Sequence, residues 1–304
     1  MPELPDITVY VERLEKLLAG AVLEKARVAS PFLLRTVDPP LSATEGKRVL
    51  GLRRLGKRIV FVLEDELFLV LHLMVAGRLQ WKDKGAKVPG KIGLAAFDFS
   101  TGTLTLTEAS QKKRASLAVV RGEDALSAHD PGGIEPMTAT LAQFKEALVA
   151  EKHTLKRTLT DPRTYSGIGN AYSDEILHRA RLSPVKMSTA LDDDELGRLY
   201  RATQAVLLEW VERLRKDDAD KPLPEKVTAF RKEMAVHGKA GQPCPVCGSP
   251  VQRIAYADNE TNYCATCQTE GKLLADRAMS TLMKKDWPKT LDELEALKKA
   301  HRSS

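Results

Sequence analysis

The hydrophobic positions follow two periods along the chain, and the change between them divides the sequence. Apolar residues recur at helical spacing from Ile7 to Leu18, with Asp6 as the expected N-cap and Gly20 as the stop. From residue 21 to about 120 the pattern becomes short β-rich runs separated by turns. Many short strands with tight turns predict a β-sandwich or barrel. The runs expected as strands are 48–55, 58–63, 67–74, 94–99 and 103–107.

A helical period replaces the β pattern after Asp130-Pro-Gly-Gly133, which marks a predicted domain boundary. Helices are expected at 141–148, 154–160, 171–181 and 191–214. The tight turn Gly167-Ile-Gly-Asn170 precedes the third of them, and its glycines allow a close backbone approach to a phosphate. Glycine-rich turns are also common between packed helices, so this turn alone does not distinguish binding from packing.

The four cysteines form the strongest local motif, two Cys-x-x-Cys pairs separated by 16 residues. Thiolates at this spacing close a tetrahedral zinc site on two β-turn knuckles. With all four positions taken by protein, one structural Zn²⁺ is predicted rather than a catalytic ion. The apolar residues within 251–256 suit a short hairpin between the pairs. The predicted ligands are Cys244, Cys247, Cys264 and Cys267.

The net charge of the chain suggests a class of binding partner. The net charge is +6 and the sequence pI is about 9.0, which favours a polyanion, although a generically basic protein has the same balance. No apolar run is long enough to span a membrane and no secretory signal is visible, so a cytoplasmic location is expected. Basic clusters in the β region either solvate strand edges or contact phosphate. These clusters are Arg53, Arg54, Lys57 and Arg58, and Lys112, Lys113 and Arg114.

The stretch Met1-Pro-Glu-Leu-Pro-Asp6 carries the candidate chemistry. Met1 precedes a small residue, so its removal by an aminopeptidase is expected and leaves Pro2 with a free secondary amine. Such an amine can form a Schiff base with an aldehyde-type carbon, and the following helix lowers its pKa. Glu3 beside it is a candidate acid or base. The alternative is that the two prolines only stiffen an exposed terminus.

Together these features resemble the formamidopyrimidine-DNA glycosylase / endonuclease VIII family of base-excision repair enzymes. The likeness runs from Met1 to about Gln268, and the stretch 167–175 is its most specific part. The residues that carry it are Met1-Pro-Glu-Leu-Pro5, Arg54-Leu-Gly-Lys57, His72-Leu73, Leu155-Lys156, Gly167-Ile-Gly-Asn-Ala-Tyr-Ser-Asp-Glu175 and Gly241-Gln-Pro-Cys-Pro-Val-Cys247.

The resemblance implies a two-domain α+β fold. An N-terminal β-sandwich headed by a helix would occupy 1–130, and a helical domain with a helix-two-turn-helix would occupy 131–235. The four-cysteine zinc finger would follow at 236–270. Beyond the resemblance, the tail at 271–304 is rich in Leu, Lys and Glu, which predicts a helical C-terminal extension. DNA with a damaged base or an abasic site would lie between the two halves, and the protein is expected to be a monomer.

The resemblance also implies roles for individual residues. Pro2 would attack C1′ of the damaged nucleotide, Glu3 would act as acid on the sugar, and Lys57 would contact phosphate and assist β-elimination. Glu175 would support the site from the second helix of the helix-two-turn-helix. The implied activity is that of a DNA glycosylase with AP-lyase activity. The further DNA contacts expected are Lys112, Lys113, Lys156, Asn170 and Asn259.

Three places depart from the family pattern. The arginine of the finger hairpin is replaced by Asn259, which has no charge, so cleavage is expected to stop at β-elimination. The Gly-Met pair after His-Leu is Met74-Val75. The loop that fills the hole left by a flipped base is Ser110-Gln-Lys-Lys-Arg-Ala115. The last two departures predict better activity on single-stranded or locally open DNA.

Two other functions remain compatible with the sequence. The first is a non-catalytic binder of damaged or single-stranded DNA with the same fold, against which the intact Pro2-Glu3 pair argues. The second is a zinc-finger nucleic-acid module with no role at lesions, which would tolerate any change at Pro2.

Overall fold

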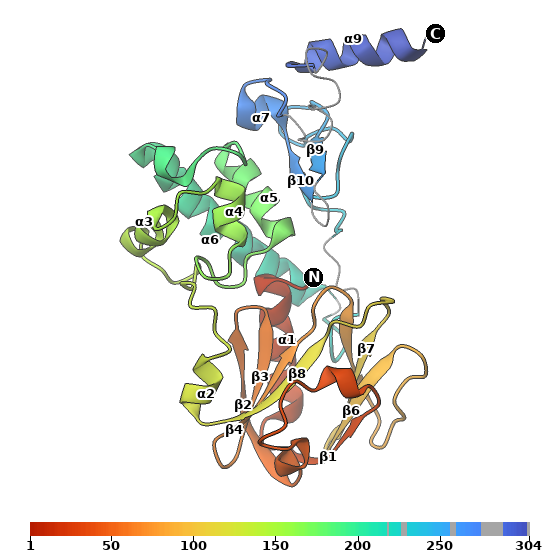
Figure 1. Ribbon diagram of the computed structural model, residues 1–304. Coiled ribbons are helices and arrows are strands. Elements are labelled where there is room, and N and C mark those ends of the chain that lie inside the picture. The colour runs from red at the N-terminus through yellow and green to blue at the C-terminus, as the bar shows by residue number, and fades with distance from the viewer. Residues whose placement is uncertain (218, 226–229, 256–259, 275–287, 303–304) are drawn as a thin grey trace. The chain divides into compact units, whose positions relative to one another are not determined.

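The chain divides into two compact units. In this computed structural model, the described residues are 1–304 except 218, 226–229, 256–259, 275–287 and 303–304 (Figure 1). One unit consists of Met1–Gly133 and Leu207–Thr228, and the other of Ile134–Val206 and Ala229–Ser304. Among the described residues, none of the helices has both the length and the apolar character needed to cross a bilayer.

The first unit is a β-sandwich, as predicted (Figure 1). Its antiparallel strands follow the order β5-β7-β6-β1-β2-β3-β4-β8. β1 pairs with β2 only at Val22–Arg48 and Leu23–Lys47, and this short junction joins two four-stranded halves. The strands are β1 (Val22–Val28), β2 (Lys47–Leu55), β3 (Arg58–Leu63), β4 (Leu67–His72), β5 (Gly77–Lys82), β6 (Gly93–Phe99), β7 (Gly102–Glu108) and β8 (Ser116–Arg121).

The core of the sandwich follows from the two-residue period of its strands, because successive side chains point to opposite faces. On β3, Ile59 and Phe61 belong to the main core, together with buried residues of β4, β6 and β7. Val60 faces the other way, into a second cluster that Leu126 of the short helix α2 (Glu123–Ser127) covers. Strands β3 and β4 are therefore covered by apolar side chains on both faces.

Helix α1 (Leu4–Leu18) completes the main core with its apolar stripe, in which Ile7, Tyr10 and Leu14 have no exposed surface. The predicted N-cap was wrong, since the N-cap is Glu3 and not Asp6. The Glu3 N–H donates to Asp6 Oδ2 at 3.0 Å, so Asp6 closes a capping box from the third helical position. The terminus is thus tied to a helix that is anchored in the core.

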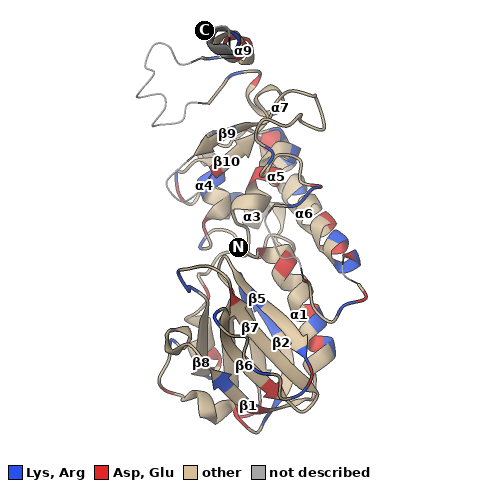
Figure 2. Ribbon diagram, turned by 90° about the vertical axis from the view of Figure 1, so that its right-hand side faces the viewer, with Lys and Arg blue, Asp and Glu red and all other residues tan. Residues whose placement is uncertain are grey.

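The second unit contains the predicted helices, each within two residues of its expected bounds. They are α3 (Leu141–Val149), α4 (Leu155–Thr160), α5 (Asn170–Ala180) and α6 (Asp193–Lys216), whose last part, from Leu207, belongs to the first unit. Acidic and basic residues alternate along α6 (Figure 2), including the ion pair Glu209–Arg213 at 3.3 Å. Such pairs support the exposed face of a long helix.

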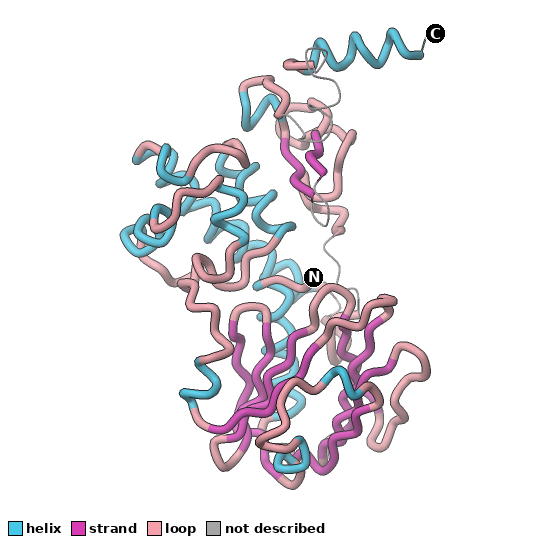
Figure 3. Tube along the Cα trace, viewed as in Figure 1, coloured by secondary structure: helices cyan, strands magenta, loops and turns pink. Residues whose placement is uncertain are grey.

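The zinc-finger segment contributes a two-stranded hairpin to this mostly helical unit (Figure 3). Strands β9 (Gln252–Ala255) and β10 (Glu260–Tyr263) pair antiparallel, and the helix α7 (Ala265–Thr269) follows. The C-terminal extension is helical where it is described at α9 (Leu291–Arg302), as expected. Leu291 packs against the finger residues Ile254 and Tyr263.

Candidate functional site

The N-terminal residues that carry the candidate chemistry are held inside the first unit rather than free in solvent. Pro2 is buried, and Glu3 is only 3% exposed. Burial also lowers the pKa of the Met1 amine from its ordinary value of 8.0. Desolvation penalises the charged ammonium, so a larger share of this amine is neutral at pH 7. An amine at this position is therefore closer to a usable nucleophile than one in water.

Charged side chains of both signs surround that amine. The carboxylates of Glu3 and Asp6 oppose the lowering of its pKa, while the cations of Arg78 and Lys57 add to it. Lys57 follows Gly56, whose φ of +59° turns the chain between β2 and β3. The structure thus brings together Glu3 and Lys57, which the sequence singled out, and adds Arg78, for which the sequence offered no motif.

His72 is a candidate that the sequence marked only as part of the family resemblance. It ends β4 and pairs in register with Arg58. Its pKa is lowered to about 4, first by burial and then by the charges of Arg58 and Lys57. Its Nε2 is buried without a hydrogen-bond partner among the residues that the structure describes. Because this nitrogen is covered, a DNA phosphate does not reach it, and the structure places His72 beside Arg58 and Lys57 without giving it a ligand. The sequence signal was a polar residue at the end of a wholly apolar strand.

The loop 109–115 is organised by one buried carboxylate, that of Glu108, which is 1% exposed. Its Oε2 accepts hydrogen bonds from the backbone N–H groups of Arg114 (2.9 Å) and Ala115 (3.0 Å). Lys113 donates its ammonium to the Glu108 backbone carbonyl, so this charge faces the loop itself. Lys112 is exposed. Of the two lysines predicted to bind DNA here, Lys112 is the one that remains available at the surface.

In the second unit, Lys156 and Asn170 meet at the start of α5. Lys156 Nζ donates to Asn170 O at 2.7 Å and to Asp174 Oδ1 at 2.6 Å, and its side chain is 13% exposed. The Lys156 ammonium thus binds two groups inside the unit, and its contact to DNA stays a prediction. Asn170, the first residue of α5, is partly exposed and follows the N-cap Gly169.

Glu175 anchors the chain segment that leads into the finger. Its carboxylate accepts backbone hydrogen bonds from Ala235 (2.7 Å), Val236 (2.9 Å) and His237 (2.9 Å). Burial raises the pKa of Glu175, and the three N–H groups act in the opposite direction. A carboxylate bound by backbone amides stabilises a fixed path of the chain, so Glu175 supports the local structure from α5.

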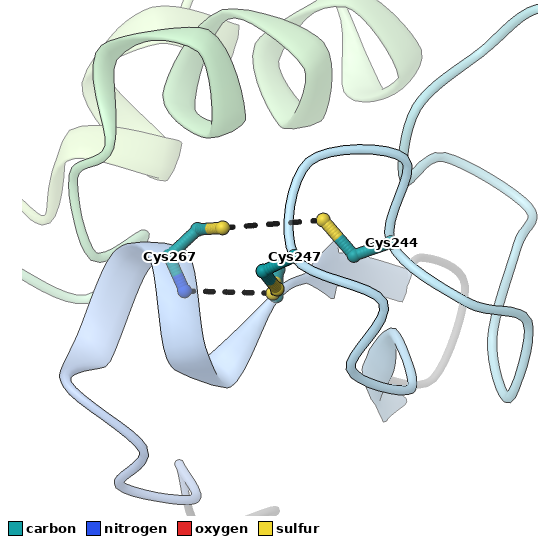
Figure 4. Close-up of side chains that lie close together, drawn as sticks. Cys244, Cys247 and Cys267 are labelled. Atoms are coloured by element: carbon teal, nitrogen blue, oxygen red, sulfur yellow. Dashed lines mark hydrogen bonds between the residues drawn. The ribbon is translucent and has the colours of Figure 1, made fainter.

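The four cysteine sulfurs converge on one point, and the predicted zinc finger is confirmed. Figure 4 shows three of these residues, Cys244, Cys247 and Cys267. Their Sγ atoms all lie within 4.8 Å of one another, with 4.0 Å between Cys244 and Cys267 and 3.4 Å between Cys247 and Cys264. A tetrahedral site with Zn–S distances of about 2.3 Å needs sulfurs about 3.8 Å apart. The thiolates therefore fit one structural Zn²⁺, with no ligand position left for a substrate.

A buried histidine also touches this centre. His178 Nε2 on α5 lies 3.2 Å from Cys244 Sγ, a contact that the sequence did not suggest. The predicted finger contact Asn259, in the hairpin tip, lies outside the described residues.

Family comparisons agree with this geometry along the chain. The formamidopyrimidine-DNA glycosylase N-terminal domain matches residues 1–117, and the formamidopyrimidine-DNA glycosylase H2TH domain matches residues 132–218. The zinc finger found in FPG and IleRS matches residues 241–269.

Individual proteins give the same result. A formamidopyrimidine-DNA glycosylase of Thermus thermophilus is 34% identical over 277 residues, covering 89% of this chain and 100% of its own. The crystal structure of the MutM (Fpg) protein from the same organism has a TM-score of 0.73 and 33% identity, covering 88% and 98% of the two chains. A structure of MutM in complex with carbocyclic 8-oxo-G containing DNA has a TM-score of 0.78 and 25% identity, covering 88% and 100%. This chain therefore belongs to the formamidopyrimidine-DNA glycosylase family.

Proposed function

We propose that the protein is a bifunctional DNA glycosylase and AP lyase of base excision repair, with Pro2 as its nucleophile once Met1 is removed. The observation that carries this proposal is the buried N-terminus: Pro2 and Glu3 are buried, and burial lowers the pKa of the Met1 amine next to them, on which the charges of Glu3, Lys57 and Arg78 also act. The related MutM complex with 8-oxo-G containing DNA supports a damaged base as the substrate.

The chemistry follows from a neutral secondary amine. The Pro2 nitrogen attacks C1′ of the nucleotide, and the bond from C1′ to the damaged base breaks as the base leaves with the electron pair and takes up the proton that the attacking amine loses. Glu3 then protonates the ring oxygen O4′ as the C1′–O4′ bond breaks, which opens the sugar and leaves an iminium at C1′. This iminium draws electrons from C2′, so a base can remove a C2′ proton. The electron pair of that C–H bond then expels the 3′ phosphate oxygen, which cuts the strand by β-elimination. The base must leave the stack first, because C1′ is otherwise enclosed.

DNA binding would use charged and polar groups in each unit. In the first unit, Lys57 and the exposed Lys112 are suited to phosphates. In the second, Asn170 at the start of α5 and Asn259 of the hairpin are the proposed contacts, and the structural zinc holds the finger that carries Asn259. We further propose that the protein is a monomer and works on chromosomal DNA in the cytoplasm. Its proposed domain boundaries lie at residues 130, 235 and 270.

Borohydride trapping tests this proposal. DNA containing an abasic site is incubated with the protein and sodium borohydride, which reduces an imine to a stable covalent link. The mature protein should be trapped, and a version that keeps Met1 or carries an N-terminal tag should not. DNA binding without trapping would instead indicate the non-catalytic binder, and equal trapping with a blocked terminus would move the nucleophile to another amine, such as that of Lys57.

A further inference from the structure

One buried carboxylate, that of Asp174, binds partners from three separate segments of the second unit. Asp174 is 1% exposed. Its Oδ1 accepts from Lys156 Nζ at 2.6 Å. Its Oδ2 lies 2.7 Å from His237 Nδ1, 3.1 Å from the backbone N of Asn262 and 3.3 Å from Asn262 Nδ2. Because a carboxylate only accepts, each of these nitrogens must donate to it.

One arm of this network reaches the turn before α5. Lys156 comes from α4, and the same ammonium that binds Asp174 also donates to Asn170 O at 2.7 Å. The first residue of α5 is therefore tied to Asp174, one turn further along the helix, through a cation from a neighbouring helix. This hydrogen bond fixes where the turn ends and the helix begins.

The other arm reaches the finger hairpin. Asn262 is 1% exposed and lies in β10, the strand that returns from the hairpin tip. Both its backbone N–H and its side-chain amide donate to Asp174. His237, in the segment that enters the finger, donates to Asp174 with its ring and to Glu175 with its backbone. Asp174 and Glu175, two successive residues of α5, thus bind both the segment that enters the finger at His237 and the strand β10 that returns from its tip.

A buried network of this kind is costly unless every member is satisfied, and well-packed apolar residues often give equal or greater stability. Stability alone therefore does not explain a charged residue at this position. What the network supplies is a fixed distance between two segments that are far apart in sequence, the turn at Asn170 and the hairpin of β9 and β10.

We propose that Asp174 is a positioning residue, which sets the spacing between the Asn170 turn and the finger hairpin so that both reach phosphates of the same DNA backbone. This inference rests on the proposed function. Asp174 and Asn262 are too deeply buried to touch DNA themselves. Any change that their replacement causes in the number of phosphates bound must therefore act through the position of the two segments.

Methylphosphonate scanning of the DNA tests this directly, because each substitution removes the charge of a single phosphate, and affinity falls where the protein contacts that phosphate through a charged or a neutral group. The variants are Asp174→Asn and Asn262→Ala. The control is Asp194→Asn, which removes one carboxylate from a side chain that is 77% exposed and forms an ion pair with Arg198 one turn along α6. The DNA carries an uncleavable abasic-site analogue. Zinc content is measured for every protein.

Both buried variants should keep one zinc per chain and bind about tenfold more weakly at moderate salt. At least one phosphate whose substitution weakens binding by the wild type should no longer affect binding by the buried variants, while Asp194→Asn keeps the wild-type pattern of sensitive phosphates. The wild-type pattern of sensitive phosphates in both buried variants, at any affinity, would overturn the proposal. If Asp174→Asn loses zinc, Asn262→Ala alone decides between the two results.

Amide hydrogen exchange without DNA separates this inference from the proposed function. Asp174→Asn should speed exchange both in the turn 167–171 and in β10, because both depend on the same carboxylate. Faster exchange in only one of them would overturn the coupling even if the protein binds DNA. Failure of the wild type to bind abasic DNA would contradict the proposed function, and the exchange result would still decide the coupling.

Discussion

At the scale of single residues, the function depends on Glu3 being both an element of structure and an acid. Its backbone N–H closes the capping box of α1, which holds the N-terminus against the core. Its side chain is buried beside the position that the Pro2 amine would take. The Glu3 side chain also accepts from the Asp6 backbone N–H in this capping box, and glutamine keeps an oxygen for that bond, so the chemical role can be tested with the cap in place.

Glu3→Gln should lower the single-turnover rate of base excision by about 10²-fold or more, because it removes an acid while keeping the size of the side chain. Affinity for lesion DNA should change little. Trapping on a preformed abasic site serves as the control, since that reaction needs the Pro2 amine but no departure of a base. An excision rate equal to that of the wild type would show that Glu3 is not the acid.

His72 provides a prediction about pH. Its pKa of about 4 in the folded protein lies below the ordinary value of 6.5, chiefly because of burial. Between these values the unfolded chain binds more protons, so acid favours unfolding. From pH 7 to pH 5, the wild type should lose ~2 kcal/mol more unfolding free energy than His72→Gln. Urea unfolding of both proteins at the two pH values measures this, and equal losses would contradict a buried neutral imidazole.

At the scale of elements, zinc determines whether the finger hairpin is formed. The site closes β9, β10 and α7 around four thiolates, and β10 in turn carries Asn262 to Asp174. Because metal binding supplies most of the folding free energy of such fingers, the hairpin is expected to lose its structure when zinc is removed.

Cys247→Ser should therefore lower zinc content and DNA affinity together. A matched control is Val246→Ala, which shortens a 59% exposed side chain next to the zinc ligand Cys247 and leaves all four thiolates in place. Zinc content and fluorescence anisotropy with labelled DNA measure the two effects. A zinc-free protein with full affinity and an intact hairpin would show that the metal is dispensable.

The elements that were predicted correctly are those with a clear local period. Strands β3, β6 and β7 and the helices of the second unit begin and end within two residues of their expected positions. Strand β1 was missed because it carries charges, and Arg27 is paired with Asp98 of β6 at 2.7 Å, far away in sequence. The strand expected to reach Met74 stops at His72, because Met74 has a φ of +52° that a hydrophobic pattern does not reveal.

The functional residues also fall into two groups, those that a local motif reveals and those that only the folded chain brings together. Pro2-Glu3 and the cysteine pairs are short motifs whose chemistry is visible in a few residues, so the sequence revealed them. The Asp174 network joins residues 18 to 88 positions apart, and only the folded chain brings them together. A local pattern could also not show that the ammonium groups of Lys113 and Lys156 are used within their own units.

At the scale of the whole molecule, the chain combines a net charge of +6 with no aromatic side chain in the loop where the family resemblance implies residues that fill the gap of a flipped base. Val75, in the turn after His72-Leu73, is 56% exposed but small. The loop 109–115 exposes Gln111, Lys112 and Arg114. These features favour attraction to the DNA backbone over filling of a duplex.

The protein should therefore excise a lesion faster from single-stranded or locally open DNA than from a perfect duplex, because extruding a paired base costs a few kcal/mol. Single-turnover rates for one lesion in one sequence, single-stranded, in a bubble and in duplex, measure the preference. Val75→Met is the matched variant, since a longer side chain should raise the duplex rate most. A clear duplex preference of the wild type would contradict the prediction.

The central claim is that the terminal amine of Pro2 forms the covalent bond to DNA, and the most direct test is to locate that bond. The borohydride-trapped complex is digested with nuclease and trypsin, and the modified peptide is sequenced by mass spectrometry. We predict the sugar remnant on the peptide of residues 2–13, at the Pro2 nitrogen, with Met1 absent. A remnant on Lys57, or on any peptide other than the N-terminal one, would contradict this claim.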